Sequence, residues 1–315
     1  GGMQRRAPAG TGGVALAAYG QEVSCVAPAM NEPLPPGLYI VATPIGNLGD
    51  LTPRAADTLR RVDLVLAEDK RVSSRLLAHA GATTRMMAYH DHSSGAARDS
   101  VLGRLSSEAV ALISDAGTPL ISDPGYKLVR AARAAGHRVT TLPGPCAAVA
   151  ALTLAGLPTD RFLFVGFLPS KAGARGEALA ELAGIRASLV FYESGPRLAA
   201  SLDAMRTVLG SRDAAVVREI SKLYEECVTG TLEELANRYG EAQSCPKGEI
   251  VVVVAPPPPP EPADEAELAS ALGEALIRLS PSRAAAEVAA SLGVPRKLVY
   301  ARALALAGDK PADPA

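Results

Sequence analysis

The segment that most constrains the fold runs from an apolar stretch through a glycine- and proline-rich loop into a helix. Residues Ala109–Ile113 are all apolar, as in a buried strand, and Tyr126–Ala135 has the apolar spacing of a helix. The loop between them, Ile113–Gly125, reads ISDAGTPLISDPG and holds two turn signals, Gly-Thr-Pro and Asp-Pro-Gly. Open α/β sheets have this order of elements and bind ligands at the carboxyl ends of their strands. The loop therefore predicts a ligand site.

Two further segments repeat this design. The strand-like Leu38–Ala42 continues into the loop sequence TPIGNLGDLT, and Val139–Leu142 is followed by Pro-Gly-Pro and a helical stretch. Neither the phosphate-binding sequence GxxxxGK[ST] nor the dinucleotide fingerprint GxGxxG occurs in these loops. We therefore expect a ligand other than a nucleoside triphosphate or a dinucleotide held by those fingerprints.

The order of strands and helices predicts two α/β domains. Strands and helices alternate between Leu38 and Ala155, which indicates a mostly parallel sheet with helices on both faces. Beyond residue 156, helices are again expected, but some strand-like runs follow one another without a helix between them, which indicates a mixed sheet. A ligand cleft between two such domains is a common arrangement. The predicted division is a disordered N-terminal arm 1–36, α/β domains 37–156 and 157–255, a proline linker 256–262 and a small helical tail 263–310.

The tail has the pattern of a helix-turn-helix. Ser282 is expected to cap a first helix, residues 293–295 to form the turn, and Arg296–Leu304 to form the second helix. A nucleic-acid reader would present Arg296 and Lys297 at the start of that second helix. A helical appendage for packing or dimerisation explains the same pattern, and we favour it.

Charge and cysteine content limit the classes of function. The formal net charge is −1, so an RNA substrate would be bound through local basic patches and shape rather than bulk charge. No apolar stretch reaches the roughly 18 residues that span a bilayer. The four cysteines are scattered without a CxxC pair, which is typical of reduced thiols in the cytosol. His90 and His92 lack a third residue at ligand spacing, so we predict no metal site.

Seven motifs spread over Leu38–Ala255 occur in a fixed order. They read PIGNLGDLT, AEDKR, SDAGTPLISDPG, LPGP, GLPTDRFLFVGFLP, VFYES and KGEI. Together they resemble the tetrapyrrole methylase superfamily and, more narrowly, its small-subunit ribosomal RNA (cytidine-2′-O)-methyltransferase branch. A single glycine-proline loop easily matches by chance, whereas seven motifs in one order do not.

The resemblance implies a cofactor, a substrate and an assembly. It implies S-adenosylmethionine (SAM) as the methyl donor, bound between the two α/β domains. It implies methylation of a ribose 2′-hydroxyl, at a cytidine in the decoding region of small-subunit ribosomal RNA, by a homodimer in the cytoplasm. By motif position, the predicted cofactor-binding residues are Pro44, Asp115, Ala116, Thr118, Pro143, Cys146, Ala147, Tyr192, Glu193 and Gly248.

Charged residues at predicted strand ends are the candidates for catalysis and for RNA contact. A base near the ribose hydroxyl would take its proton, and the catalytic candidates are Asp69, beside Glu68, and Glu219 with Lys222. Each of these charges is also explained as a solvated group or a surface ion pair. The predicted RNA contacts, which have the same alternative explanation, are Lys70, Arg71, Arg161, Lys171, Arg175 and Arg197.

Two positions depart from the family's pattern. The related enzymes read AEDTR where this chain reads AEDKR, so that Lys70 replaces a threonine. Pro196 stands where they carry a histidine before the arginine that follows VFYES. Lys70 is expected to add a phosphate contact, while Pro196 cannot replace the histidine. Both changes concern the RNA contacts and leave the SAM prediction unaltered.

Two alternative functions fit parts of the sequence. A tetrapyrrole C-methyltransferase would use the same fold, although the TPIGNLGDLT loop and the helical tail count against it. A non-enzymatic nucleic-acid-binding regulator would use Ser282–Leu304, with the α/β domains as a ligand sensor, and the near-neutral charge counts against it. The main prediction is the RNA methyltransferase.

Overall fold

The computed structural model describes residues 33–90, 95–241, 245–258 and 265–308. Most of the predicted N-terminal arm (1–36) and of the proline linker (256–262) lies outside the described residues, as does His92. Contacts divide the chain into two units, Gly1–Cys146 and Ala147–Ala315. This division lies before the boundary predicted at residue 156, because the helix that begins at Ala147 packs on the second sheet. Within the described ranges, no helix has the length and apolar character that a membrane span requires.

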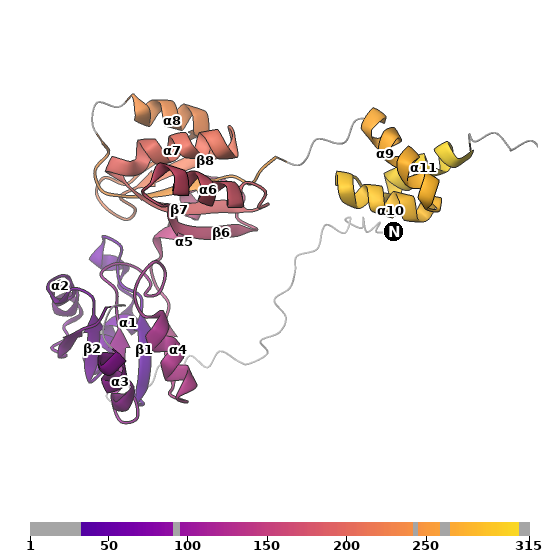
Figure 1. Ribbon diagram of the computed structural model, residues 1–315. Helices are drawn as coiled ribbons and strands as arrows, with labels where there is room; N and C mark the ends of the chain where they lie inside the picture. Colours follow the sequence, from indigo (N-terminus) through magenta and orange to yellow (C-terminus); the bar gives the residue numbers. More distant parts are fainter. Residues whose placement is uncertain (1–32, 91–94, 242–244, 259–264, 309–315) are drawn as a thin grey trace, which may run out of the picture. The chain divides into compact units, whose positions relative to one another are not determined.

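The first unit, drawn in indigo to magenta in Figure 1, is built on a parallel five-stranded sheet with the strand order β3-β2-β4-β1-β5. All of its strand pairings are parallel, which confirms the predicted parallel sheet. The strands are β1 (Gly37–Val41), β2 (Leu64–Ala67), β3 (Met86–Ala88), β4 (Ala109–Leu112) and β5 (Val139–Leu142). The helices between them are the short 3₁₀ helix η1 (Leu48–Asp50), α1 (Pro53–Arg61), α2 (Lys70–Ala80), α3 (Gly95–Arg104) and α4 (Tyr126–Ala134).

The central strands of this sheet are apolar on both faces because helices cover both. Successive strand residues point to opposite faces of a sheet. Tyr39 and Val65 belong to one core with side chains of α1 and α2, whereas Leu38 and Leu66 belong to another with side chains of α3 and α4. Parallel strands buried in this way read as continuous apolar runs. The two cores hold the sheet, and with it the loops at its carboxyl edge.

The second unit has a mixed five-stranded sheet with the order β6-β7-β10-β8-β9. β6 and β7 are parallel and the other pairings are antiparallel, which confirms the predicted mixed sheet. The strands are β6 (Phe162–Phe167), β7 (Ser188–Ser194), β8 (Asp213–Arg218), β9 (Glu226–Thr231) and β10 (Glu249–Val254). The helices are α5 (Ala147–Ala155), α6 (Ala172–Leu182), α7 (Gly195–Leu209) and α8 (Leu232–Gly240).

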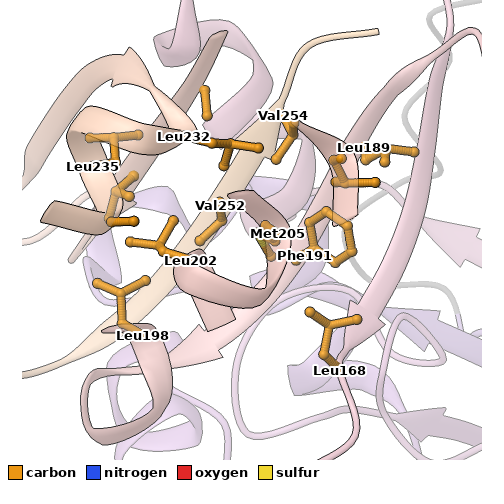
Figure 2. Close-up of a cluster of buried hydrophobic side chains, with 14 of the residues drawn as sticks. Leu168, Leu189, Phe191, Leu198, Leu202, Met205, Leu232, Leu235, Val252 and Val254 are labelled. Atoms are coloured by element: carbon orange, nitrogen blue, oxygen red, sulfur yellow. The ribbon is translucent and has the colours of Figure 1, made fainter. Parts of the chain in front are cut away.

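One apolar core joins helices α6, α7 and α8 to this sheet (Figure 2). Phe191 and Val252 of the strands lie in it with Leu202 and Met205 of α7 and Leu235 of α8. In the described structure α5 contacts β7, β8, β9 and β10 but contributes nothing to this core, so it covers the other face of the sheet. Burying each large apolar side chain contributes about 1.5–3 kcal/mol, which fixes the strand ends relative to one another.

The tail is a bundle of three helices with a core of its own. Leu272, Val288 and Val299 are buried in that core. The helix that Ser282 was expected to cap has Pro281 as its first residue and Ser280 at the N-cap, so the predicted cap is wrong. Proline suits the first helical position, where the N–H that it lacks would have no helical partner. The three helices are α9 (Glu265–Arg278), α10 (Pro281–Leu292) and α11 (Arg296–Gly308).

Candidate functional site

The carboxyl edge of the first sheet carries the predicted ligand residues of the first unit. Because the strands are parallel, the loops that follow β1, β2, β4 and β5 lie at the same edge. Ala147 begins α5 and belongs to the second unit. The edge holds Pro44 after β1, Asp69, Lys70 and Arg71 after β2, Asp115, Ala116 and Thr118 after β4, and Pro143 and Cys146 after β5.

Hydrogen bonds tie three of these loops together. Thr43 and Gly117 exchange two backbone bonds, with N···O distances of 2.8 and 3.1 Å, and so join the loops after β1 and β4. The Thr118 hydroxyl donates to the carbonyl oxygen of Pro145 at 2.9 Å, which joins the β4 loop to the β5 loop. Gly117 has φ +83°, a left-handed conformation that glycine adopts without strain. The three predicted loops therefore form one structure.

Asp115 and Ala116 are exposed at the turn of the β4 loop. Asp115 Oδ1 accepts a hydrogen bond from the backbone N–H of Asp69 at 3.1 Å, which links this loop to the end of β2. The Thr118 hydroxyl hydrogen, in contrast, is used inside the protein. An exposed carboxylate with capacity for further hydrogen bonds suits a cationic or hydrogen-bond-donating ligand.

Asp69 is the N-cap of α2. Its carboxylate accepts a hydrogen bond from the backbone N–H of Arg71 at 2.8 Å and pairs with the guanidinium of the same residue at 2.8 Å. The side-chain hydrogen bond from Arg71 is the main reason why the pKa of Asp69 falls to about 2. The carboxylate is therefore ionised at neutral pH, but it is a weaker base than an ordinary aspartate. Its geometry supports a capping role more than proton transfer.

Asp123 is a partly buried carboxyl group of this edge that the sequence analysis missed. Burial raises its pKa to about 6, a hydrogen bond with Ser114 opposes the rise, and the negative charges of Glu68 and Asp115 add to it. The only sequence signal is the Asp-Pro-Gly turn, which carries no information on burial. No group of three or more His, Cys, Asp or Glu side chains in the described part of the chain is arranged to hold a metal ion.

One edge of the second sheet gathers most of the remaining predicted residues. β6, β7 and β8 run parallel to one another, so their carboxyl ends share this edge with the amino ends of β9 and β10. Arg161 precedes β6 and therefore lies at the opposite edge. The shared edge carries Lys171, Tyr192, Glu193, Arg197, Glu219, Lys222 and Gly248.

Glu193 is an internal anchor for the start of α7. Its side chain is 1% exposed and accepts hydrogen bonds from the N–H of Ser194 at 2.9 Å and from the hydroxyl of Ser201 at 2.5 Å. Arg197 Nε lies 3.3 Å from the same carboxylate, and the Arg197 guanidinium also donates to the carbonyl oxygen of Leu168. The Glu193 carboxylate, a predicted cofactor contact, and the Arg197 guanidinium, a predicted RNA contact, are thus both bound within the unit. Only the backbone of Glu193 is left to contact a cofactor.

Three further predicted residues differ in what they offer a ligand. Lys171 is exposed at the N-cap of α6. Arg175 is buried and donates to a backbone carbonyl of the preceding loop at 3.3 Å, so its predicted contact with RNA is not supported. Tyr192 packs edge-to-face against the rings of Phe164 and Phe167, with centroid distances of 4.9 and 5.7 Å.

Two glycines permit close approach of backbone at this edge. A Cβ at Gly195, the first residue of α7, would overlap the carbonyl oxygen of Pro246. Gly248 has φ +98°, and a Cβ there would overlap the Glu219 carboxylate. The VFYES and KGEI motifs therefore lie against each other, and Gly248 has a structural role beside Glu219.

Glu219 and Lys222, two of the catalytic candidates, form an ion pair. Lys222 Nζ lies 2.8 Å from Glu219 Oε1 and 2.8 Å from Glu249 Oε2. The hydrogen bond from Lys222 holds the pKa of Glu219 below its ordinary value. Burial opposes the charged form of Lys222, but its hydrogen bonds to both carboxylates outweigh burial and raise its pKa. Glu219 and Lys222 are therefore both ionised at neutral pH.

Two family models and several curated relatives match the chain. The model described as Tetrapyrrole (Corrin/Porphyrin) Methylases matches residues 37–236, and the model described as RsmI C-terminal HTH domain matches residues 262–307. A ribosomal RNA small subunit methyltransferase I from Erythrobacter litoralis is 56% identical over 276 residues, which cover 87% of this chain and 97% of the relative. The protein of the same name from Escherichia coli O157:H7 is 44% identical over 269 residues, or 85% of this chain and 94% of the relative.

Solved structures share the fold at low sequence identity. The methyltransferase CobJ has a TM-score of 0.54 and 17% identity, over 70% of this chain and 94% of its own. A cobalt precorrin-4 methyltransferase has a TM-score of 0.51 and 16% identity, over 69% of this chain and 94% of its own. Diphthine synthase has a TM-score of 0.52 and 14% identity, over 69% of this chain and 89% of its own. These likenesses confirm the predicted architecture of two α/β sheets.

Proposed function

Because the chain belongs to the tetrapyrrole methylase family, in its ribosomal RNA small subunit methyltransferase I branch, we propose that it is a SAM-dependent RNA methyltransferase. Its acceptor is a ribose 2′-hydroxyl of small-subunit ribosomal RNA, at a cytidine in the decoding region. The observation that carries the proposal is the 56% identity over 97% of a curated relative's length. Relatives with this name favour an RNA substrate over a tetrapyrrole.

We place the methyl donor at the carboxyl edge of the first sheet. SAM carries a positively charged sulfonium, and the exposed Asp115 carboxylate on the tied loops fits such a cation. The bonds between Thr43 and Gly117 fix the loops before a ligand arrives, so little ordering is needed on binding. Tyr192, Glu193 and Gly248 stay predicted donor contacts of the second unit. The residues proposed to hold the donor are Pro44, Asp115, Ala116, Thr118, Pro143, Cys146 and Ala147.

We propose that catalysis rests mainly on positioning. When bound, SAM supplies an activated methyl group, so an acceptor oxygen held in line with it matters more than a strong base. Asp69 and Glu219 are ionised, but they already accept hydrogen bonds from Arg71 and Lys222. We therefore assign Glu219 and Lys222 a positioning role at the edge of the second sheet, and Asp69 the role of holding the start of α2.

Exposed cations near strand ends are proposed to contact RNA phosphates. Lys70 and Arg71 begin α2, Lys171 precedes α6, and all three are exposed. Phosphate contacts of this kind contribute affinity that falls as salt rises. The structure supports a phosphate contact less for the other predicted residues, Arg161, Arg175 and Arg197.

We further propose that the enzyme acts as a homodimer in the cytoplasm, since the family resemblance implies both. Sedimentation of the purified protein at micromolar concentration tests the dimer. A mass equal to one chain at all concentrations would reject it.

Incubation of the purified protein with SAM and with small ribosomal subunits that lack the mark tests the activity. A 2′-O-methyl group protects the adjacent phosphodiester bond from alkaline cleavage, because the attacking hydroxyl is blocked. We expect one newly protected bond with the wild-type protein and none with Asp115→Arg, which places a cation beside the sulfonium. A bond that stays cleavable would reject the RNA activity. Methyl transfer to a porphyrinoid instead would favour the C-methyltransferase alternative.

A further inference from the structure

The loop between β8 and β9, Glu219–Glu225, presents two apolar side chains to solvent. Leu223 is 88% exposed and Tyr224 is 68% exposed. Among the described residues, Leu223 is the most exposed of the large apolar side chains. Single exposed apolar residues are common, so this pair is informative only if the fold holds it in place.

The loop is held firmly from within the unit. Lys222 binds the carboxylates of Glu219 and Glu249, both at 2.8 Å. The N–H of Ser221 donates to the Glu225 carboxylate at 2.6 Å, and the N–H of Glu225 donates to the carbonyl oxygen of Lys222 at 3.2 Å. Glu219 and Ser221 have φ +53° and +66°, conformations that persist only where surrounding contacts enforce them. The exposed pair is therefore a fixed feature of the surface.

The charges beside the pair restrict what it can bind. Glu225 and Glu226 follow it directly, and Glu226 pairs with Arg218 at 3.0 Å. Arg218 and Lys222, the cations beside the pair, are both bound to carboxylates, so they leave little positive charge for a phosphate group. The ring of Tyr224 offers instead a flat, uncharged face, on which any nucleobase can stack. The chemistry of the pair fits a base rather than the backbone of a nucleic acid.

Building on the proposed RNA methylation, we propose that Leu223 and Tyr224 form a stacking tip for an unpaired base of the RNA substrate. The tip lies at the edge of the second sheet that also carries Lys222 and Gly248. Sequence-specific RNA recognition targets unpaired bases, which are splayed out and stacked on aromatic side chains. One nucleobase needs only an aromatic face of this size to stack on, so the pair by itself is enough to hold an unpaired RNA base.

A tryptophan reporter tests where the RNA base lies. The chain contains no tryptophan, so Tyr224→Trp gives a single reporter and keeps an aromatic face. We expect its emission to be quenched by small subunits that lack the mark and unchanged by SAM alone. Phe162→Trp is the matched control, because Phe162 is also exposed but begins β6 at the opposite edge of the sheet. Equal quenching at both positions, or none at position 224, would overturn the proposal.

Truncation of the ring provides an independent measurement. Tyr224→Ala is expected to weaken subunit binding roughly 5- to 100-fold, the cost of one lost stacking contact. The salt dependence of binding should stay as in the wild type, whereas Lys171→Ala should reduce it by removing a phosphate contact. SAM affinity, measured by calorimetry, should be unchanged in Tyr224→Ala.

The outcomes show whether the tip proposal or the proposed function on which it rests has failed. If the wild-type protein does not methylate the subunits, the proposed function fails. If the wild type methylates them and Tyr224→Ala binds and methylates them equally well, only the tip proposal fails. If Tyr224→Ala converts a dimer to single chains in sedimentation, the pair belongs to a self-interface and the tip proposal is also overturned.

Discussion

Past the carboxyl end of β4, the carboxyl group of Asp123 is partly buried and lies near two negative charges. Burial is the main cause that raises its pKa from 3.8 to about 6, with Glu68 and Asp115 adding to the rise. Because the pKa in the folded state exceeds that in the unfolded state, folding favours the protonated form. The stability that this provides is fully present below the unfolded pKa and is lost as the pH rises through about 6.

Asp123→Asn keeps the shape of the side chain and cannot ionise. We expect its free energy of unfolding to exceed that of the wild type by roughly 1–2 kcal/mol at pH 7.5, because the carboxyl group is only partly buried and solvent screens part of the penalty, and by less at pH 4.5. Denaturant midpoints at the two pH values measure this. Asp160→Asn, at an exposed position, is the control for replacing a carboxylate by an amide. The same difference at both pH values for Asp123→Asn would contradict the buried charge.

The Asp115 carboxylate is proposed to act on the sulfonium of the donor through its charge. Asp115→Asn removes the charge but keeps an oxygen that can accept the N–H of Asp69. We expect about tenfold weaker binding of SAM and a smaller loss for S-adenosylhomocysteine, which lacks the positive sulfur. Calorimetry with the two ligands measures both affinities. Equal losses would show that the charge of Asp115 does not distinguish them.

The positions of the motifs predicted which residues lie at the sheet edges. They did not predict which of those side chains are already hydrogen-bonded within the protein. Arg197 stands four residues after Glu193, but Glu193 lies in β7 and α7 begins only at Gly195, so helical spacing did not predict their pairing. The burial of Glu193 was not predictable either, because it depends on Ser201 and on the loop at Leu168, which another strand positions. Arg175 illustrates the same limit, since its burial arises from packing that no local pattern records.

At the scale of elements, the start of α7 can contact the segment before β10 only because Gly195 has no side chain. Gly195→Ala would place a Cβ against the carbonyl oxygen of Pro246, so backbone must move. We expect a loss of more than about 2 kcal/mol in the free energy of unfolding. Gly176→Ala in α6 is the matched control, because its Cβ would meet no atom within 4 Å. It should stabilise the protein by about 1 kcal/mol through helix propensity. Equal effects of the two changes would contradict the close approach.

Helix boundaries show where local patterns are ambiguous. Ser280 and Ser282 are both good N-cap residues, and Pro281 between them decides which one acts. A residue before proline is disfavoured in helical conformation, and Ser280 is indeed extended, with φ −66° and ψ 154°. The sequence held this information, and the prediction of Ser282 overlooked it.

At the scale of the whole molecule, the tail is expected to be independent in stability. Its core consists of its own residues, such as Leu272, Val288 and Val299. A chain that ends at residue 258 should therefore keep the SAM affinity and the denaturant midpoint of the α/β part within error. Calorimetry and denaturation of the two chains measure this. A clear drop in the midpoint would show that the tail stabilises the α/β part, and a drop in subunit methylation alone would favour the nucleic-acid reader.

The class of each sheet was predictable, whereas the order of its strands was not. Alternation of strands with helices demands parallel neighbours, and strands without helices between them demand antiparallel ones. The position of β10 between β7 and β8 depends on pairing over long sequence separations. The apolar run at residues 250–254 indicates a central strand but does not identify the strands that pair with it.

The exchange of hydrogen bonds between Thr43 and Gly117 runs through main-chain atoms alone. Bonds of this kind survive when the surrounding residues drift, because every amino acid other than proline carries the same N–H and C=O groups. Related proteins that keep these bonds can change the outer residues that bind the methyl acceptor while the proposed donor site keeps its shape. One fold can then serve different acceptors, because main-chain atoms rather than particular side chains hold its loops together.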